Sequence, residues 1–275
     1  MYAHTMFVMS LVKLRAWNEA SEQLDRAIKA TAPAVDGSDE SRTPWALRCL
    51  QAEIAAGLGR EDECINLLYE LMSDSWKSNN ERRYKETTFV LLAKLVRVGR
   101  YKSALSLCNQ YLSRFPQDFY AWSQVSRIQM LLGDFPAAQN SIEQNSRISS
   151  SNEPTQGKDP ATLLALTNRP AEAMRALEAL ESETTLANEI AVCQALSGSL
   201  SDARRTLESA FRQPPSSVLS LVREAITSNL MTLVDLVPQE RDSQEARRRV
   251  GAWIAAAAPD DFDLTLASKQ SISTL

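Results

Sequence analysis

Residue types that commonly carry chemistry are few in this chain, and their spacing assembles no reactive centre. The only histidine, His4, has no second metal ligand near it in the sequence. The cysteines lack the paired spacing of a zinc site, so we expect reduced, buried thiols at Cys49, Cys64, Cys108 and Cys193. No phosphate-binding glycine loop and no glycine-flanked serine is present. The sequence therefore predicts no enzyme, no metal and no cofactor.

Charge and hydropathy exclude two further classes of protein. A net charge of −4 and a pI near 5.3 argue against a nucleic-acid binder that works by neutralising phosphates. No apolar run reaches the roughly eighteen residues that a membrane-spanning helix needs. We interpret the acidic pairs Glu61–Asp62 and Asp260–Asp261 as solvated charge. The run Arg247–Arg249 is interpreted in the same way, although it could also contact an acidic lipid or a partner.

The elements that would position any site follow from one pattern that occurs twice, at a spacing of 34 residues. Gly99, Tyr101, Ala104 and Cys108 recur as Gly133, Phe135, Ala138 and Ile142. Pro116 follows the first pass, where a helix must stop because proline has no amide proton to donate. This combination of an apolar stripe, a turn, a small residue, an aromatic and a proline is the signature of the tetratricopeptide repeat (TPR).

The physical roles of these positions support the TPR interpretation. Gly99 and Gly133 are placed at the turn between two helices, where positive φ carries no steric penalty for glycine. Ala104 and Ala138 are placed where the second helix crosses the first, and a larger side chain there would separate the helices. A single helical hairpin cannot bury its apolar face, so further hairpins must flank this pair.

Read in order, the chain predicts about six helical hairpins. The hairpins are expected at residues 2–32, 43–72, 82–115, 119–148, 161–180 and 190–210, with Arg15, Gly59, Asn168 and Gly198 as their further turn residues. The second hairpin should begin with a Thr43 cap and a first-turn Pro44. Loops are predicted at residues 31–43, 73–80 and 149–160, because these stretches are rich in polar and turn-forming residues.

The pattern changes after the Pro214–Pro215 stop. Residues 218–237 predict one long amphipathic helix, and a second is expected from Pro238 with Trp253 on its buried side. We therefore expect an all-α, TPR-like solenoid with C-terminal capping helices over residues 1–258, followed by a polar tail at 259–275.

Candidate partner-binding residues come from the geometry of such a solenoid, in which the first helix of each hairpin lines the concave groove. The predicted contact residues are Phe89, Arg97, Tyr120, Arg127 and Asn188, with Val96 and Met130 on the same face. This mixture suits a partner helix or an extended segment. The alternative is that some of these side chains merely pack between adjacent repeats.

Four stretches of the chain resemble the C-terminal TPR region of the TRAPP (trafficking protein particle) complex subunit 12 family, over roughly residues 10–265. The matching positions are Pro44, Arg48, Leu50, Ala52, Glu53, Leu58 and Gly59; Arg127, Ile128, Gly133 and Asp134; Ala191–Cys193, Gly198, Leu200, Asp202, Leu207 and Glu208; and Asn229, Leu230 and Thr232. Among them Glu53, Cys193 and Asn229 are not general TPR positions.

The resemblance implies a non-catalytic scaffold subunit of a vesicle-tethering complex that activates a Rab GTPase by nucleotide exchange, in ER–Golgi traffic and autophagy. Its partners would be the other tethering subunits. Its location would be the cytoplasm, with membrane contact only through the complex. The alternative function is a stand-alone TPR adaptor or co-chaperone that binds a peptide segment in its concave groove. The lysines and asparagines with which chaperone-binding TPR domains hold a terminal carboxylate are not evident in any three successive repeats.

Overall fold

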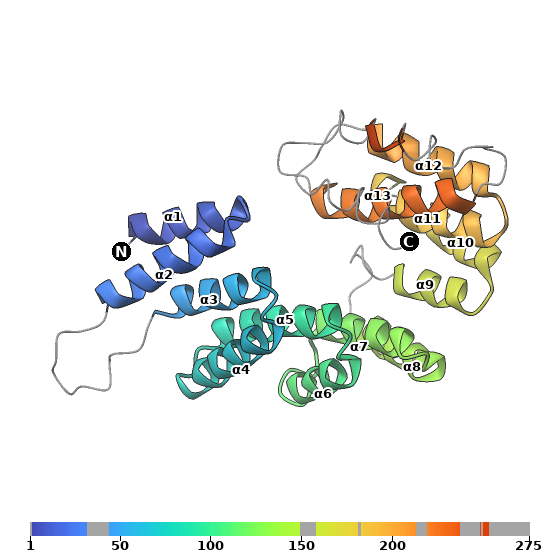
Figure 1. Ribbon diagram of the computed structural model, residues 1–275. Coiled ribbons are helices and arrows are strands. Elements are labelled where there is room, and N and C mark those ends of the chain that lie inside the picture. Colours follow the sequence, from blue (N-terminus) through green and yellow to red (C-terminus); the bar gives the residue numbers. More distant parts are fainter. Residues whose placement is uncertain are drawn as a thin grey trace. The chain divides into compact units, whose positions relative to one another are not determined.

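Helices joined by short turns make up the chain. The computed structural model describes residues 2–31, 44–148, 158–180, 183–212, 219–236, 248 and 250–252. Within these ranges all of the regular structure is α-helical, in thirteen helices (Figure 1). The chain divides into two compact units, Met1–Ala121 (unit 1) and Trp122–Leu275 (unit 2). The boundary falls in the first turn of a helix, Phe119–Leu131.

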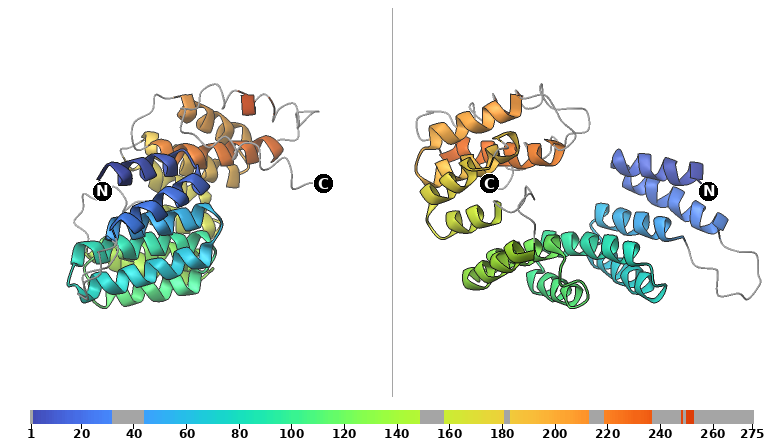
Figure 2. Two further views of the ribbon diagram at one scale, coloured as in Figure 1. Left: turned by 60° about the vertical axis from the view of Figure 1, so that its left-hand side comes forward. Right: turned by 180° about the vertical axis from the view of Figure 1, so that it is seen from behind.

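Unit 1 is a stack of helical hairpins. Its helices are α1 (Tyr2–Lys13), α2 (Trp17–Thr31), α3 (Trp45–Gly57), α4 (Glu61–Lys77), α5 (Glu81–Arg97), α6 (Tyr101–Leu112) and the start of α7 (Phe119–Leu131). From α1 to α6 each helix packs against the next along the chain, and α2 lies beside both α1 and α3 (Figure 2). The first helices α1 and α3 also touch each other, which is the neighbour relation expected of a solenoid.

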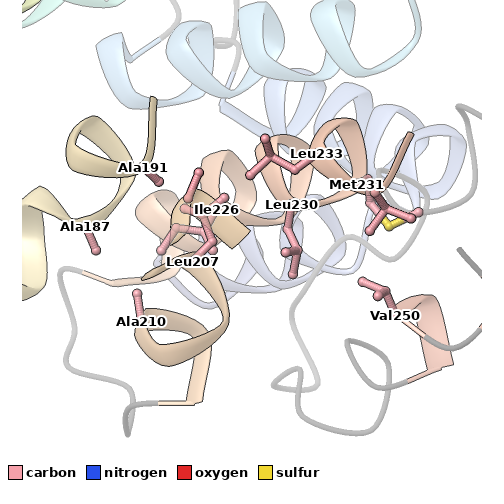
Figure 3. Packing of buried hydrophobic residues seen from close by; sticks show 11 residues of the cluster. Ala187, Ala191, Leu207, Ala210, Ile226, Leu230, Met231, Leu233 and Val250 are labelled. Carbon is pink, nitrogen blue, oxygen red and sulfur yellow. The ribbon is translucent and has the colours of Figure 1, made fainter. Parts of the chain in front are cut away.

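Unit 2 continues the same design. After α7 it contains α8 (Phe135–Ile148), α9 (Lys158–Leu166), α10 (Pro170–Glu178), α11 (Glu183–Leu196), α12 (Leu200–Arg212) and α13 (Leu219–Leu236). One apolar cluster of unit 2 joins α11, α12 and α13, with Leu207 beside Ile226 and with Val250 packed onto the same cluster (Figure 3). The long helix predicted over residues 218–237 is therefore confirmed as α13, and it covers the last hairpin.

The turns are built alike in both units. Gly59, Gly99, Gly133 and Gly198 have φ between 76° and 85°, and Arg15, Asn79 and Asn168 take the same left-handed conformation. At Gly133 the next amide, that of Asp134, donates to the Gln129 carbonyl at 2.9 Å. The carbonyl of Asp134 then accepts from the Ala138 amide at 3.0 Å. One residue thus ends a helix and begins the next one, and the predicted turn positions are confirmed.

The small crossing residues are confirmed as well. The fifth residue after a hairpin turn is Ala20, Cys64, Ala104, Ala138, Ala173 or Ala203, and each of these has no exposed surface. Such close packing requires a small side chain where two helices cross. The turn at Asn79 differs, because it joins two hairpins rather than the helices within one, and its fifth residue is the buried Tyr84.

The predicted loop at residues 73–80 is wrong. Helix α4 runs on to Lys77 and α5 begins at Glu81. The polar composition is outweighed by packing, since the Trp76 ring lies 5.3 Å from the Tyr84 ring. Within the helix the Ser75 hydroxyl is satisfied by the Leu71 carbonyl. Only three residues connect the two helices, and the Asn80 side chain caps α5 by accepting from the Arg83 amide.

Two other predicted boundaries are also corrected. Helix α9 begins at Lys158 rather than Ala161, since Pro160 is tolerated in a first helical turn. Helix α3 begins at Trp45, so Pro44 is the capping residue and not the first helical residue. The predictions for residues 32–43, Pro214–Pro215, Pro238, Trp253 and the 259–275 tail lie outside the described residues. The single solenoid over residues 1–258 stays a prediction.

The left-handed turns predict a specific mutational result at Gly133. A Cβ added there would meet no atom within 4 Å, so any cost comes from the backbone conformation alone. Gly133→Val should lower the free energy of unfolding by about 1–3 kcal/mol, because a β-branched residue resists positive φ. Gly133→Asn is the matched control and should lose clearly less, since Asn79 and Asn168 already adopt this conformation. Equal losses in thermal unfolding would show that φ is not the constraint.

Candidate functional site

The first helices of the hairpins in unit 1 enclose an apolar hollow of about 350 Å³. It is lined by Thr5 and Met9 of α1; Trp45, Ala46, Cys49, Leu50, Ala52 and Glu53 of α3; and Glu86, Thr87, Val90 and Lys94 of α5. Cys64 and Leu68 of α4 complete the lining. A volume of this size is within the range of ligand and anchor-residue pockets.

The hollow follows from helical spacing. On α5 the positions Glu86, Val90 and Lys94 are four residues apart, and on α3 so are Trp45, Cys49 and Glu53. Residues four apart share one helix face, and eight residues advance about 12 Å. The two rows therefore form the walls of a groove about two helical turns long. Its centre is open to solvent, since Val90 is 45% exposed.

Charged side chains stand at the ends of this groove. At one end Glu53 accepts from the Lys94 ammonium at 3.4 Å. Two turns earlier on α5, Glu86 pairs with Arg82 at 2.8 Å. Both carboxylates are nearly half exposed, whereas the Lys94 side chain is only 12% exposed. Arg83 also lies over the Trp45 ring at 5.5 Å, and Arg82 and Arg97 are exposed, so charges of both signs border the groove.

Two polar atoms of the groove walls are buried without a hydrogen bond among the described residues. They are the indole Nε1 of Trp45 and the hydroxyl Oγ1 of Thr87. Thr87 is only 2% exposed, and an unsatisfied buried polar group costs about 1–3 kcal/mol. Side-chain oxygens of Glu61, Asn145, Glu189 and Thr227 are in the same state away from the hollow, so this feature is not particular to the groove.

The cysteines have the character of packing residues. Three are buried, Cys49 is half-buried, and none forms a disulfide. Burial raises the pKa of the Cys49 thiol to about 11 and that of Cys108 to about 12. Burial also raises the pKa of Cys64, which lines the hollow. These thiols stay protonated near neutral pH, and a protonated thiol is a poor nucleophile.

The predicted contact residues of unit 1 divide into two kinds. Arg97 is exposed and follows Lys94 on the same face of α5, so it extends the rim of the groove. Phe89 instead packs between repeats, with its ring 4.8 Å from Tyr120 and 5.2 Å from Tyr111. Tyr120 remains 46% exposed and is available to a partner. The alternative interpretation, packing between repeats, therefore applies to Phe89.

An aromatic cluster surrounds this packing. Tyr84 stacks on Tyr111 at 6.2 Å, and Arg114 lies over the Trp76 ring at 3.8 Å while donating to the Tyr84 hydroxyl. Burial and the hydrogen bond to Asp118 raise the pKa of Tyr111. Through these contacts α4, α5 and α6 pack against one another, and the orientation of α5 is fixed.

In unit 2 the predicted contact residue Arg127 is bound within the fold. Its Nε donates at 2.8 Å to Asp159, whose side chain is 7% exposed. Ser123 also donates to this carboxylate at 2.5 Å. Asp159 was expected in a loop, but it lies in the first turn of α9, where a carboxylate is favoured by the helix dipole. The network joins α7 to α9.

The remaining predicted positions of unit 2 are also partnered. The side-chain oxygen of Asn188 accepts a hydrogen bond from the side-chain nitrogen of Asn229 at 2.7 Å, and this bond links α11 to α13. Met130 is 7% exposed and belongs to a core cluster with Ala138, Ile142 and Leu163. Met130 is thus a packing residue. Sequence reasoning missed Trp45, Cys49 and Val90, although their four-residue spacing beside Glu53 and Glu86 was the available signal.

The described residues hold no group of three histidine, cysteine or acidic side chains that could bind a metal ion. Among the described helices, none combines the length and the apolar character needed to cross a bilayer. The acidic pair Glu61–Asp62 lies in the first turn of α4; Glu61 is half-buried, and the exposed Asp62 pairs with Arg100. Arg248 is exposed.

Comparisons with known proteins show the fold. No family model and no curated protein matches the sequence. A tetratricopeptide repeat protein from Parabacteroides merdae superposes with a TM-score of 0.57 at 15% identity, covering 97% of this chain and 98% of that one. The crystal structure of the APC/C hetero-tetramer Cut9–Hcn1 matches with a TM-score of 0.54 at 10% identity. The match covers 99% of this chain and 49% of the other one. A TPR protein of Thermus thermophilus matches with a TM-score of 0.50 at 16% identity, covering 66% of this chain and 96% of that one.

These likenesses, together with the repeated turns and crossing residues, establish an all-α TPR solenoid. The fold class predicted from the sequence is confirmed.

The Arg127–Asp159 pair predicts a loss of stability in one variant and not in its control. Arg127→Ala should lower the free energy of unfolding by about 1–3 kcal/mol, because it leaves a buried carboxylate without its cation. Arg97→Ala removes an exposed arginine and should stay within about 0.5 kcal/mol of the wild type. In thermal unfolding, Arg127→Ala combined with Asp159→Ala should lose less than the sum of the single changes. Additive losses would mean that the two residues are not coupled.

Proposed function

We propose that this protein is a non-catalytic protein-interaction scaffold, and that its groove-forming first helices hold the partner. The observation that carries the proposal is the apolar, solvent-open hollow on α1, α3 and α5. Large exposed apolar patches with a polar rim commonly mark protein-binding surfaces. Arg97 and Tyr120 add the residue types that most often anchor an interface.

The particular role we propose is that of a TRAPP subunit 12-like member of a vesicle-tethering complex. It rests on the resemblance at Glu53, Cys193 and Asn229, which general TPR geometry does not require. Two of these residues have contacts that suit a constrained position, since Glu53 pairs with Lys94 and Asn229 binds Asn188. In this role the protein would work in the cytoplasm, at ER–Golgi membranes, through the other subunits.

A subunit role is compatible with what this fold does elsewhere. The Cut9–Hcn1 structure is that of a hetero-tetramer and contains a chain of the same fold. That protein spans about twice the aligned length, so the likeness supports assembly in general and no particular partner. The second candidate function is a stand-alone adaptor that binds a single peptide segment, which the same hollow would also serve.

Affinity capture of the tagged chain from cells, followed by identification of the co-purified proteins, tests the tethering role. The wild type should retain the other tethering subunits. Arg97→Ala combined with Tyr120→Ala should reduce their recovery at least severalfold, because both side chains are exposed and interfaces depend on a few such anchors. Arg127 is unsuitable for this test, since its removal disturbs the Asp159 network.

The matched control is Asn66→Ala, on an exposed position of α4, with retention of fold checked by circular dichroism. If the wild type recovers no trafficking subunit, the tethering role is excluded and the adaptor role takes its place. If the double variant retains every subunit, the partner uses a different surface.

A further inference from the structure

We infer that the outward face of α1 binds α1 of a second copy of this chain, and that the two helices cross as an antiparallel pair. This face, which we call the α1 end face, consists of Met6, Phe7, Ser10 and Leu14. Leu14 continues the last turn of α1, since its amide donates to the Ser10 carbonyl at 3.0 Å. The inference goes beyond the proposed scaffold role, because none of these residues lines the groove.

The α1 end face is exposed although it is apolar. Helix α1 lies at one end of unit 1, where it packs against α2 and α3 (Figure 2). Met6 is 46% exposed, Phe7 52% and Leu14 77%. On the other side of α1, Val8 and Leu11 are buried in the apolar cluster of the first hairpin. A helix that is apolar on both sides is usually covered on both sides.

The same face of the next first helix is a packing surface. In α3 the positions nine, five and one before the left-handed turn residue are Leu50, Ile54 and Leu58, and all three pack against the first hairpin. In α1 the same three positions are exposed, and they are Met6, Ser10 and Leu14. The α1 end face is thus the surface with which this fold stacks one hairpin on another, and no described hairpin covers it.

The order of side chains on this face is self-complementary. Met6, Ser10 and Leu14 form one row four residues apart, with the small side chain in the middle. Two such rows that cross in opposite directions at Ser10 place Met6 of each copy against Leu14 of the other. The Ser10 hydroxyl already donates to the Met6 carbonyl at 3.0 Å, so its burial leaves no unpaired donor.

The charges around the face permit this pairing. Helix α1 contains no acidic residue, and the exposed carboxylates of the first hairpin are on α2, at Glu19, Glu22 and Asp25. Lys13 is the one lysine of α1, and Arg15 follows in the turn. In a pair centred on Ser10 the two Lys13 residues are about 9 Å apart along the helix axis. Each lies beside Phe7 of the other copy, where a cation–π contact is favourable.

A membrane surface suits this face less well than a second copy does. Helices that lie on membranes carry several lysines or arginines beside their apolar face, whereas α1 has the single Lys13. The side of α1 that would carry such residues is packed against its own hairpin through Val8 and Leu11.

Sedimentation of the full chain over a concentration series tests the inference. A contact of one helix per copy is at the small end of interface sizes, so we expect a reversible equilibrium between monomer and dimer. Leu14→Glu should weaken the dimer at least tenfold, whereas Asn18→Glu adds the same charge to an exposed position of α2 and should change little. A wild type that is monomeric at every concentration overturns the inference, and so does a dimer that Leu14→Glu leaves unchanged.

A cysteine at the crossing point tests the pairing without a charge change. Ser10→Cys should give a covalent dimer under mild oxidation, because the twofold axis brings the two introduced sulfurs together. Asn18→Cys is the matched control and should remain monomeric on a non-reducing gel. This test stays valid should Leu14→Glu lose its fold by circular dichroism. Equal cross-linking of the two cysteine variants overturns the antiparallel pairing at Ser10.

Flotation with vesicles of phosphatidylcholine and phosphatidylserine tests the membrane alternative. The wild type should not float with the vesicles. A monomeric wild type that floats, together with a Leu14→Glu variant that does not, would assign the α1 end face to a membrane and overturn the inference.

Discussion

The structure depends on a turn in which one residue belongs to two helices. In each hairpin the residue after the left-handed position, such as Arg100 or Asp134, donates its amide to the helix that ends and accepts at its carbonyl from the helix that begins. This sharing removes any flexible linker between the helices. It also sets the crossing residue five positions after the left-handed one, so that Ala104 or Ala138 reaches the point of contact.

The groove on unit 1 is a consequence of this constraint. Because every hairpin turns in the same way, the first helices α1, α3 and α5 present equivalent faces, and rows spaced by four residues come into line. The aromatic cluster around Tyr84 and Tyr111 holds the second side of α5, so the face with Val90 stays open. The same packing that stabilises the fold therefore leaves an apolar surface exposed. Exposed apolar surfaces are uncommon on monomeric proteins and commonly mark sites of protein binding.

The sequence was sufficient to predict the features that depend on the spacing of nearby residues. The turn positions at Gly59, Gly99 and Asn168 and the small residues five positions later follow from helix geometry. The extent of α4 could not be predicted, because its polar last turn is held by Trp76 packing on Tyr84. The sequence placed Asp159 in a loop, although it lies in a helix. The residue that holds it, Arg127, is 32 positions away in the sequence, so no nearby pattern indicates the contact. The groove combines side chains from four helices, and composition alone could not identify the open face.

Amide hydrogen exchange tests the shared turn most directly. If one residue truly joins both helices, the amide protons of Arg100 and Asp134 should exchange as slowly as those of Ala104 and Ala138 in the same hairpins. The Lys102 amide is the internal reference, because a first-turn amide has no partner within its helix and should exchange fast. Turn amides that exchange as fast as Lys102, while the crossing residues stay protected, would contradict the account.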